Sequence, residues 1–532
     1  MKELIMIFTM QLLFINNGIV YSQATQEWNS RYGKTGIDVA NSIATDNFGN
    51  VYVTGTVTDP FSNYDIVTIK YSQSGKQLWL SKYNGPANGS DAAFKIKLDS
   101  KGNVIVTGKS EGVGTNFDFI TIKYSSSGEQ KWSSRYNSPE NRYDEAGNIN
   151  IDSLDNIYIT GYSSWNYVII KYDSLGNQIW VSSYGNINYI DVPHATVLDK
   201  LGNIFITGDS SIDTATSRDI ATIKYNSDGI LQWAARFNST YNENEYGKDL
   251  GVDNDGNIYV CGGSQGDLFY DDYIIVKYDS SGIEQWNRRY NGSANFLDQA
   301  RYLVIDNSNN IYITGYSTHT GTGYDYTTIK YNTNGDQLWI SRYNNGLNDV
   351  PNHMIIDSYG NLYVTGMSDG SGTGKDYATV KYDSAGNQLW VIRFDYSGQY
   401  GDIPYAIDVD NNGSVYVTGE SDRDILTIKY SQLTGVNPIS FGTPSEYKLE
   451  QNYPNPFNPA TVISYELKVT ERAKLIVYDI LGNEIATLVD ESKPAGSYEI
   501  VFDGSDFPSG IYFYSLRVDG NLIDTKRMTL LK

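Results

Sequence analysis

A repeat of about 50 residues runs through most of the 532-residue chain and restricts the possible folds more than any other feature. Three markers each recur eight times: a strand-like segment such as Gly49–Gly55, a segment such as Thr68–Tyr71, and a tryptophan followed four residues later by tyrosine or phenylalanine. The repeated tryptophans are Trp28, Trp79, Trp132, Trp180, Trp233, Trp286, Trp339 and Trp390. Turns such as Asp383–Gly386 reverse the chain, because aspartate can bond its own backbone and glycine accepts a positive φ. Each repeat is therefore predicted to form four short antiparallel strands.

Four-stranded units of this kind cannot bury both faces alone, and stacking them around an axis gives a β-propeller. An open solenoid of the same units is the alternative, and the two ends of the array decide between them. Trp28 has no Thr-Ile-Lys-Tyr segment before it, and the last such segment, which ends at Tyr430, has no tryptophan after it. We therefore predict an all-β, eight-bladed β-propeller over residues 23–433, in which the N-terminal strand closes the last blade.

The repeated motifs resemble a known repeat family. The segments Gly49–Gly55, Thr68–Tyr71 and Gln77–Trp79 are similar to the SBBP family of bacterial β-propeller repeats. This resemblance covers most of the chain, and it implies a propeller fold without an agreed activity. The family is commonly associated with seven blades, whereas each marker here occurs eight times.

Residues 1–22 are predicted to be a signal peptide. Lys2 precedes an apolar stretch, Leu4–Ile15, and Val20–Ser22 suits a signal-peptidase site. A membrane anchor is the alternative, but the apolar stretch is too short to span a bilayer. No later stretch is long and apolar enough to span, so we expect no transmembrane segment in the mature protein.

Charge and cysteine content restrict the partners. The formal net charge of −22 disfavours nucleic acid, because such a surface repels phosphate backbones. The single cysteine, Cys261, excludes an intramolecular disulfide and metal sites built from several thiolates. We therefore expect no cofactor, and among ionic ligands the acidic balance favours divalent cations such as Ca²⁺.

The pattern changes after the repeats. Residues 434–446 are predicted to be a linker, and residues 447–532 a small Ig-like β-sandwich, because strand-like runs alternate with turn signals there. The segments Tyr447–Pro459 and Lys526–Lys532 are similar to type A sorting domains of the type IX secretion system. Residues that carry this similarity include Pro454, Asn455, Pro456, Phe457, Asn458, Pro459, Gly510, Tyr512, Lys526 and Arg527.

The sorting-domain resemblance implies a route of export. The signal peptide would carry the chain to the periplasm, and the outer-membrane secretion machinery would recognise the tail. Removal of the tail would then release the protein or attach it to surface lipopolysaccharide. The resemblance therefore implies a secreted or outer-membrane surface location in a Gram-negative bacterium. An adhesive or spacer module is the alternative for this domain.

Charged residues also recur in every blade. Aspartates near the start of each first strand are predicted to accept backbone N–H bonds and lock adjacent blades, with Ca²⁺ binding as the alternative. These aspartates include Asp38, Asp91, Asp144, Asp191, Asp298, Asp349 and Asp402. The lysines of the Thr-Ile-Lys-Tyr segments are predicted to pair with strand aspartates such as Asp65 and Asp325, and a cationic binding ring is their alternative.

Ligand binding is predicted where the blades differ from one another. The variable loops share one rim, and aromatic side chains beside polar groups there suit sugars or extended peptides. Trp165 is the one tryptophan outside the repeated position. The candidate rim residues are Trp165, Tyr167, Asp191, His194, Tyr270, Tyr324 and His353.

These features predict a secreted or cell-surface binding scaffold whose ligand is a glycan or a protein. The alternative is an extracellular enzyme, either a polysaccharide-active hydrolase or lyase or a quinoprotein-like oxidoreductase. The turn and tryptophan at Asp173–Trp180 resemble the tryptophan-docking motif of eight-bladed quinoprotein dehydrogenases, although the Asp-to-Gly spacing is one residue shorter. No residue is assigned a catalytic role.

Overall fold

The computed structural model describes residues 24–432, 437–440 and 446–531, apart from 34–35, 61–62, 186–188, 212–217, 242, 267–269, 371, 397, 399, 494–495 and 506. The predicted signal peptide lies outside these residues. The described chain is all-β, as predicted, and it forms two units, Ala24–Gln432 and a second unit that contains the C-terminal residues from Leu433 onward. Nowhere in the described ranges does a helix reach the length and apolar character needed to cross a membrane.

Eight four-stranded antiparallel sheets, the blades, form the first unit of the described chain. Blades one to four consist of β2 (Val39–Thr45), β3 (Val51–Asp59), β4 (Asn63–Tyr71) and β5 (Gln77–Tyr83); β6 (Asp91–Leu98), β7 (Val104–Glu111), β8 (Phe117–Tyr124) and β9 (Gln130–Tyr136); β10 (Asp144–Ile151), β11 (Ile157–Ser163), β12 (Asn166–Tyr172) and β13 (Gln178–Tyr184); and β14 (Asp191–Leu198), β15 (Ile204–Ser210), β16 (Asp219–Tyr225) and β17 (Leu231–Phe237). Blades five to eight consist of β18 (Glu245–Val252), β19 (Ile258–Gln265), β20 (Asp271–Tyr278) and β21 (Glu284–Tyr290); β22 (Asp298–Ile305), β23 (Ile311–His319), β24 (Gly323–Tyr331) and β25 (Gln337–Tyr343); β26 (Asp349–Ile356), β27 (Leu362–Gly370), β28 (Gly374–Tyr382) and β29 (Gln388–Phe394); and β30 (Asp402–Val409), β31 (Val415–Ser421), β32 (Asp424–Gln432) and β1 (Ala24–Tyr32).

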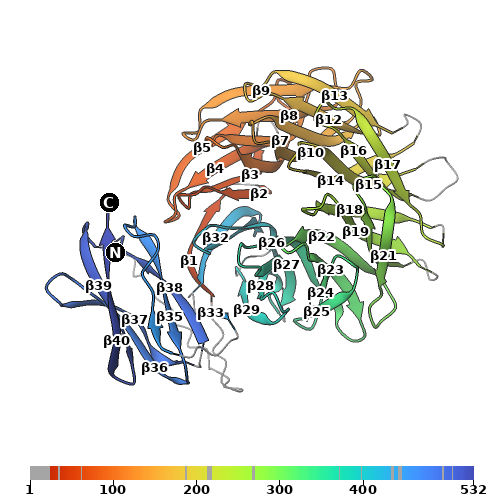
Figure 1. Cartoon of the computed structure of the whole chain (residues 1–532). Helices are drawn as coiled ribbons and strands as arrows, with labels where there is room; N and C mark the ends of the chain where they lie inside the picture. Colours follow the sequence, from red (N-terminus) through yellow and green to blue (C-terminus); the bar gives the residue numbers. More distant parts are fainter. Residues whose placement is uncertain are drawn as a thin grey trace. The chain divides into compact units, whose positions relative to one another are not determined.

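The blades follow one another around a ring (Figure 1). The first strand of each blade lies nearest the axis and contacts the first strand of the next blade, and β2 of blade one contacts β30 and β31 of blade eight. Each core cluster of the propeller combines buried side chains from two neighbouring blades; Tyr52 of blade one, for example, packs with Ile96 and Val106 of blade two. The ring is therefore continuous, and every blade covers a face of its neighbour.

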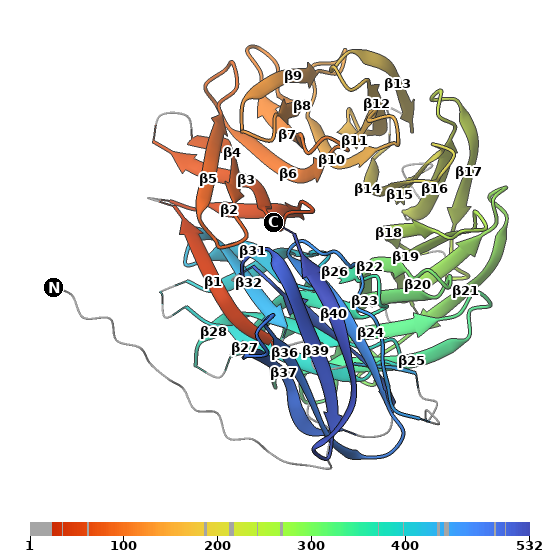
Figure 2. The ribbon, with the colours of Figure 1, turned by 60° about the vertical axis from the view of Figure 1, so that its left-hand side comes forward.

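The N-terminal strand closes the ring, as predicted. β1 pairs antiparallel with β32, from Ala24 opposite Gln432 to Tyr32 opposite Ile425. Both views of the ring show β1 at the outer edge of the blade that contains β31 and β32 (Figure 2). The last blade therefore draws its fourth strand from the other end of the propeller sequence.

The repeated tryptophan packs on the turn of the next blade. The Trp28 indole nitrogen donates a hydrogen bond to the Gln73 carbonyl at 2.9 Å, and a Cβ added to Gly75 would lie 2.6 Å from the Trp28 ring. The Trp79 ring meets Gly128 in the same way. Glycine at this position therefore provides both the positive φ of the turn and the room for the indole.

The lysines of the Thr-Ile-Lys-Tyr segments have other partners than predicted. The Lys123 amine lies 2.8 Å from Asp99 and donates to the Ser174 carbonyl of the next blade at 3.0 Å. Asp325, a predicted partner, instead pairs with Arg342. The predicted pairing is wrong because the aspartate and lysine are five residues apart, and residues at odd spacing point to opposite faces of a strand.

The second unit contains two four-stranded sheets. One sheet has the order β33 (Asn437–Ser440), β38 (Gly496–Asp503), β35 (Ala460–Leu467) and β34 (Lys448–Leu449), and the other has the order β37 (Glu484–Lys493), β36 (Glu471–Tyr478), β39 (Gly510–Val518) and β40 (Asn521–Leu530). One buried cluster joins side chains from both sheets, among them Tyr465, Leu475 and Met528. Within the predicted linker, β33 pairs with β38, so this segment belongs to the sandwich.

Candidate functional site

The aspartates at the start of the first strands accept backbone hydrogen bonds, as predicted. The carboxylate of Asp91 accepts from the Gly85 N–H at 2.6 Å, and that of Asp144 from the Ser138 N–H at 2.7 Å. Both donors lie in the crossover from the preceding blade. Burial raises the pKa of Asp144 above its ordinary value, and the bonds from Ser138 and Ser163 offset part of this effect. These carboxylates fix the chain where one blade passes to the next.

The junction between blades seven and eight carries an additional carboxylate. Asp376, Asp395 and Asp402 bring carboxylate oxygens within 4.8 Å of one another, and among the described residues they form the group that could hold a metal ion. Such oxygen ligands suit Ca²⁺. Asparagine occupies the position of Asp395 at five other junctions, as Asn84, Asn137, Asn238, Asn291 and Asn344. Asp395 therefore adds a charge where most blades have a neutral side chain.

Replacing Asp395 with asparagine is expected to stabilise the protein in calcium-free buffer. Burial and the nearby Asp376 raise the pKa of Asp395, so its negative charge is disfavoured in the folded state. Removing this partly exposed charge should raise the thermal unfolding midpoint by about 1–2 °C, measured by calorimetry with EDTA. Asp228→Asn, which removes an exposed turn carboxylate, is the control. A lower midpoint for Asp395→Asn would contradict the expectation.

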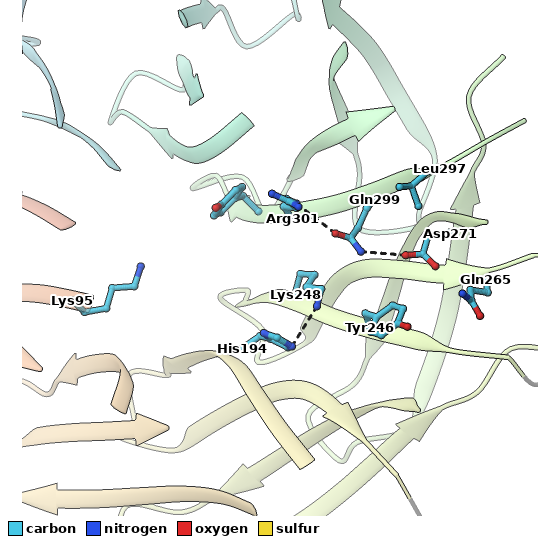
Figure 3. A pocket seen from close by; sticks show the side chains of 10 residues that line it. Lys95, His194, Tyr246, Lys248, Gln265, Asp271, Leu297, Gln299 and Arg301 are labelled. Atoms are coloured by element: carbon cyan, nitrogen blue, oxygen red, sulfur yellow. Dashed lines mark hydrogen bonds between the residues drawn. The ribbon is translucent and has the colours of Figure 1, made fainter. Parts of the chain in front are cut away.

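A polar cavity of about 630 Å³ lies inside the ring. Most of its lining side chains come from the first strands of blades two, four, five and six; β19 and β20 of blade five add Gln265 and Asp271, and Leu297 immediately precedes β22. Figure 3 shows Lys95 reaching toward the cavity from the opposite side of the ring to His194, Lys248 and Arg301. The full lining is Lys95, His194, Tyr246, Lys248, Gln265, Asp271, Leu297, Gln299, Arg301 and Tyr302.

Hydrogen bonds link the lining residues into two groups (Figure 3). In the first group, His194 Nε2 lies 3.3 Å from the Lys248 amine and 3.1 Å from an oxygen of Asp209. In the second, Arg301 Nε donates to Gln299 at 3.4 Å, and the Gln299 amide donates to Asp271 at 3.2 Å. Burial raises the pKa of Asp271 to about 6. The cavity is therefore bordered by side chains that already hold one another in place.

Within the described part of the chain, the Lys95 amine lines the cavity without a nearby carboxylate. Among the described residues, no carboxylate lies within 4.0 Å of its amine. Burial lowers the pKa of Lys95, and the charge of Asp249 opposes this effect without direct contact. The Lys95 ammonium group is thus held inside the ring without an ion pair.

Four of the predicted rim residues have side chains that are not enclosed in the core. His194 lines the cavity. Trp165 is 38% exposed in the turn between β11 and β12, with the Arg142 guanidinium 5.5 Å from its ring. Tyr270 stacks on Phe296 with ring centres 4.0 Å apart, and Tyr324 packs against Tyr316. The last three residues lie outside the lining of the cavity.

Of the other three predicted rim residues, Tyr167 and Asp191 are buried and His353 is half-buried. Tyr167 is fully buried in a core cluster, and its hydroxyl donates to the Asp209 carbonyl, so its prediction as a rim residue is wrong. The prediction of Asp191 as a rim residue is also wrong, because its side chain is 1% exposed at a blade junction. His353 lies inside the ring, where its Nδ1 accepts from the Ile407 N–H at 3.3 Å and burial lowers its pKa to about 3.

Most of the cavity lining was missed from the sequence. Lys248 and Arg301 each lie three residues after the repeated acidic residue of the first strand, as His194 does. At this position other blades have residues such as Asn41 and Gly147. A comparison of the first strands position by position could have found this cationic group, because nothing in the propeller scaffold requires it.

The opposite end of the first strands is apolar. A second cavity, of about 390 Å³, is lined by residues such as Leu198, Leu250 and Ile305, which lie at the ends of the same strands that begin at the polar cavity. The interior of the ring therefore changes from charged to apolar along its axis.

The predicted sorting residues, far apart in sequence, meet in the second unit. Asn455 accepts a hydrogen bond from the Thr529 N–H at 2.9 Å, and Phe457 exchanges backbone hydrogen bonds with Thr529 and Leu531. Phe457 is buried, whereas Asn455 and Arg527 are exposed. The same segment contains the exposed residues Pro454, Pro456, Asn458 and Pro459. Lys526 is half-buried on β40, and Gly510 is the first residue of β39. The buried Tyr512 donates a hydrogen bond to the Pro508 carbonyl.

Comparison with known proteins identifies both units. Residues 451–529 match the secretion system C-terminal sorting domain, and residues 27–61, 232–270 and 338–372 match the SBBP β-propeller repeat. An uncharacterized WD repeat-containing protein of Acanthamoeba polyphaga mimivirus is 24% identical over 464 residues, which are 74% of this chain and 30% of the relative. The regulatory protein FlaEY of Caulobacter vibrioides is 22% identical over 245 residues, which are 41% of this chain and 24% of the relative. The chain spans less than a third of the length of either relative.

Solved structures resemble the chain at low identity. PorZ, an essential bacterial surface component of the type IX secretion system of Porphyromonas gingivalis, has a TM-score of 0.40 and 11% identity, over 92% of this chain and 74% of that chain. A polysaccharide lyase has a TM-score of 0.41 and 10% identity, over 64% of this chain and 89% of that chain. The sorting tail indicates export to a secreted or cell-surface location and interaction with the secretion machinery. The chain thus contains SBBP β-propeller repeats and a type IX C-terminal sorting domain, which indicate a propeller protein exported to a secreted or cell-surface location.

Proposed function

We propose that this protein is an extracellular binding protein that holds a glycan in the polar cavity of the propeller. The cavity of about 630 Å³ supports this proposal, because ligand sites usually enclose about 300–1,000 Å³. Tyr246 and Tyr302 offer aromatic faces, and Gln265 and Gln299 offer amide groups that can bond hydroxyls. Because the walls are strands of several blades, the site is rigid before the ligand arrives.

Binding is a better account of this cavity than hydrolysis. Most glycoside hydrolases act through a pair of carboxyl groups on either side of the bond that breaks. Among the described lining residues, Asp271 is the one carboxylate. The Asp271 carboxylate also accepts a hydrogen bond from Gln299. The geometry therefore favours recognition of a sugar over cleavage by the hydrolase mechanism.

Replacing Tyr246 with alanine is expected to weaken glycan binding about tenfold, because an aromatic wall of the cavity is lost. The mature protein would first be screened on a glycan array, and the strongest ligand would then be measured by calorimetry. Tyr246 is half-buried, so the unfolding midpoint of the variant must be compared with that of the native protein.

The matched control is Trp165→Ala, which removes an exposed aromatic side chain at the rim outside the cavity. Its affinity is expected to equal that of the native protein. Failure of every glycan on the array to bind would overturn the proposed function. A ligand that responds to Trp165→Ala and not to Tyr246→Ala would place binding at the rim.

A further inference from the structure

The cavity walls carry the opposite charge to the protein as a whole. The chain has a formal net charge of −22, yet Lys95, Lys248 and Arg301 line the cavity with one carboxylate, Asp271. Since burial raises the pKa of that carboxyl to about 6, it remains easier to protonate than an exposed aspartate. The cavity is therefore a local cationic site in an acidic protein.

Two of these cations have no ion pair. In the part of the chain that the structure describes, neither the Lys95 amine nor the Arg301 guanidinium has a carboxylate oxygen within 4.0 Å. Arg301 bonds the neutral Gln299 and lies 4.8 Å from the centre of the Tyr316 ring. Both side chains are half-buried, so each cation has lost part of its water without gaining an anion, which is unfavourable. An anionic ligand would supply the missing partner.

Lys248 shares a single carboxylate behind the cavity with His194 and Arg218. One oxygen of Asp209 lies 3.1 Å from His194, 3.8 Å from Arg218 and 3.9 Å from Lys248. Asp209 is 3% exposed, so it does not itself face a ligand. One negative charge cannot neutralise both Arg218 and Lys248, so the charge of Lys248, which lines the cavity, is only partly compensated by Asp209.

The kind of anion follows from the rest of the surface. A long polyanion would be repelled by an acidic protein, whereas one acid group can enter a small cationic cavity. Tyr246 and Tyr302 stand beside the cations and suit the ring of the sugar that bears the acid. We infer that the cavity binds an acidic glycan whose carboxylate or sulfate group lies near Lys248 and Arg301 and faces Lys95 across the ring, an inference that rests on the proposed function.

The test compares charged and neutral forms of the same sugar by calorimetry on the mature protein. Trigalacturonate and its methyl ester differ in charge and hardly in shape, and a sulfated and an unsulfated galactan trisaccharide form the second pair. We expect an acidic member to bind at least tenfold more tightly than its neutral partner, and the pair that shows the difference distinguishes carboxylate from sulfate. Because an acid group makes few ionic contacts, its affinity should fall modestly between 50 and 200 mM salt.

Lys95→Met and Arg301→Gln remove the two unpaired charges and keep most of each side chain. Each substitution is expected to lower the affinity for the acidic sugar at least tenfold and to leave the affinity for its neutral form unchanged. Lys82→Met is the control, because Lys82 is an exposed cation that pairs with Asp59 outside the cavity. Unfolding midpoints close to that of the native protein would exclude a folding defect.

Two outcomes would overturn the inference. If the acidic and the neutral form of a sugar bound equally well, and Tyr246→Ala abolished the binding of both, the proposed glycan binding would stand. The inference that the cavity selects an acidic group would then be wrong. Acidic binding that persists unchanged in both Lys95→Met and Arg301→Gln would place the acid group elsewhere. Absence of binding to any glycan of the array would instead overturn the proposed function.

Discussion

A mature chain that lacks β1 is expected to unfold at a temperature roughly 10 °C or more below that of the native protein. Without β1, β32 becomes an exposed edge and loses its partner from Ile425 to Gln432. Removal of Trp28 also uncovers Tyr71 and Tyr416, which its ring contacts, and because Trp28 is half-buried this loss costs less than the ~3–5 kcal/mol of a fully buried indole. Calorimetry and size-exclusion chromatography would measure the lower midpoint and the aggregation of chains through the open edge.

The control for this deletion is a chain in which β1 is moved to follow β32 through a short turn. Because the two strands are antiparallel and Ala24 lies opposite Gln432, this hairpin preserves the native pairing. The rearranged protein is expected to melt close to the native protein. A deletion variant that melts at the native temperature would show that the ring does not need its N-terminal strand.

Deletion of residues 446–532 is expected to abolish secretion while leaving the propeller folded in the periplasm. The propeller, Ala24–Gln432, is a separate unit with its own cores, so the loss should concern export and not stability. Cell fractionation with antibody detection would show less than a tenth of the protein in the medium and on the surface. Mass spectrometry of the native product should find a first residue near Gln23.

A single substitution can test whether the secretion machinery recognises exposed residues of the sorting domain without disturbing the fold of that domain. Arg527 is exposed on β40, so Arg527→Ala should leave the fold of the domain unchanged. Secretion of the Arg527→Ala variant is expected to fall if the secretion machinery binds the exposed sorting residues. Propeller that reaches the medium at the native level without the tail would contradict the sorting assignment.

The fold could be predicted because each repeat has features that only one arrangement satisfies. The complementary ends of the array, Trp28 without a preceding segment and Tyr430 without a following tryptophan, were enough to predict the closing strand. The spacing of tryptophan and turn glycine did not reveal that the two meet in adjacent blades, since the contact of Trp28 with Gly75 depends on how sheets pack.

The candidate site was harder to predict, because the sequence does not tell which variable positions face the same space. Tyr167 was expected at the rim as an aromatic residue of a variable loop, yet it lies on β12, where strand alternation turns its ring into the core. Lys95 and Arg301 are four blades apart in sequence and line the same cavity only because the strands surround an axis. Charges that a linear pattern scatters can therefore form one cavity in a ring.

The strand that completes the ring has a consequence for biogenesis. β1 is the first part of the propeller to be synthesised, and its partner, β32, is the last. Until β32 emerges, both ends of the array are incomplete, and two chains that are close together could each donate β1 to the other. Crossing the inner membrane one chain at a time would limit this exchange, so crowding during overproduction should yield swapped dimers before it yields unfolded protein.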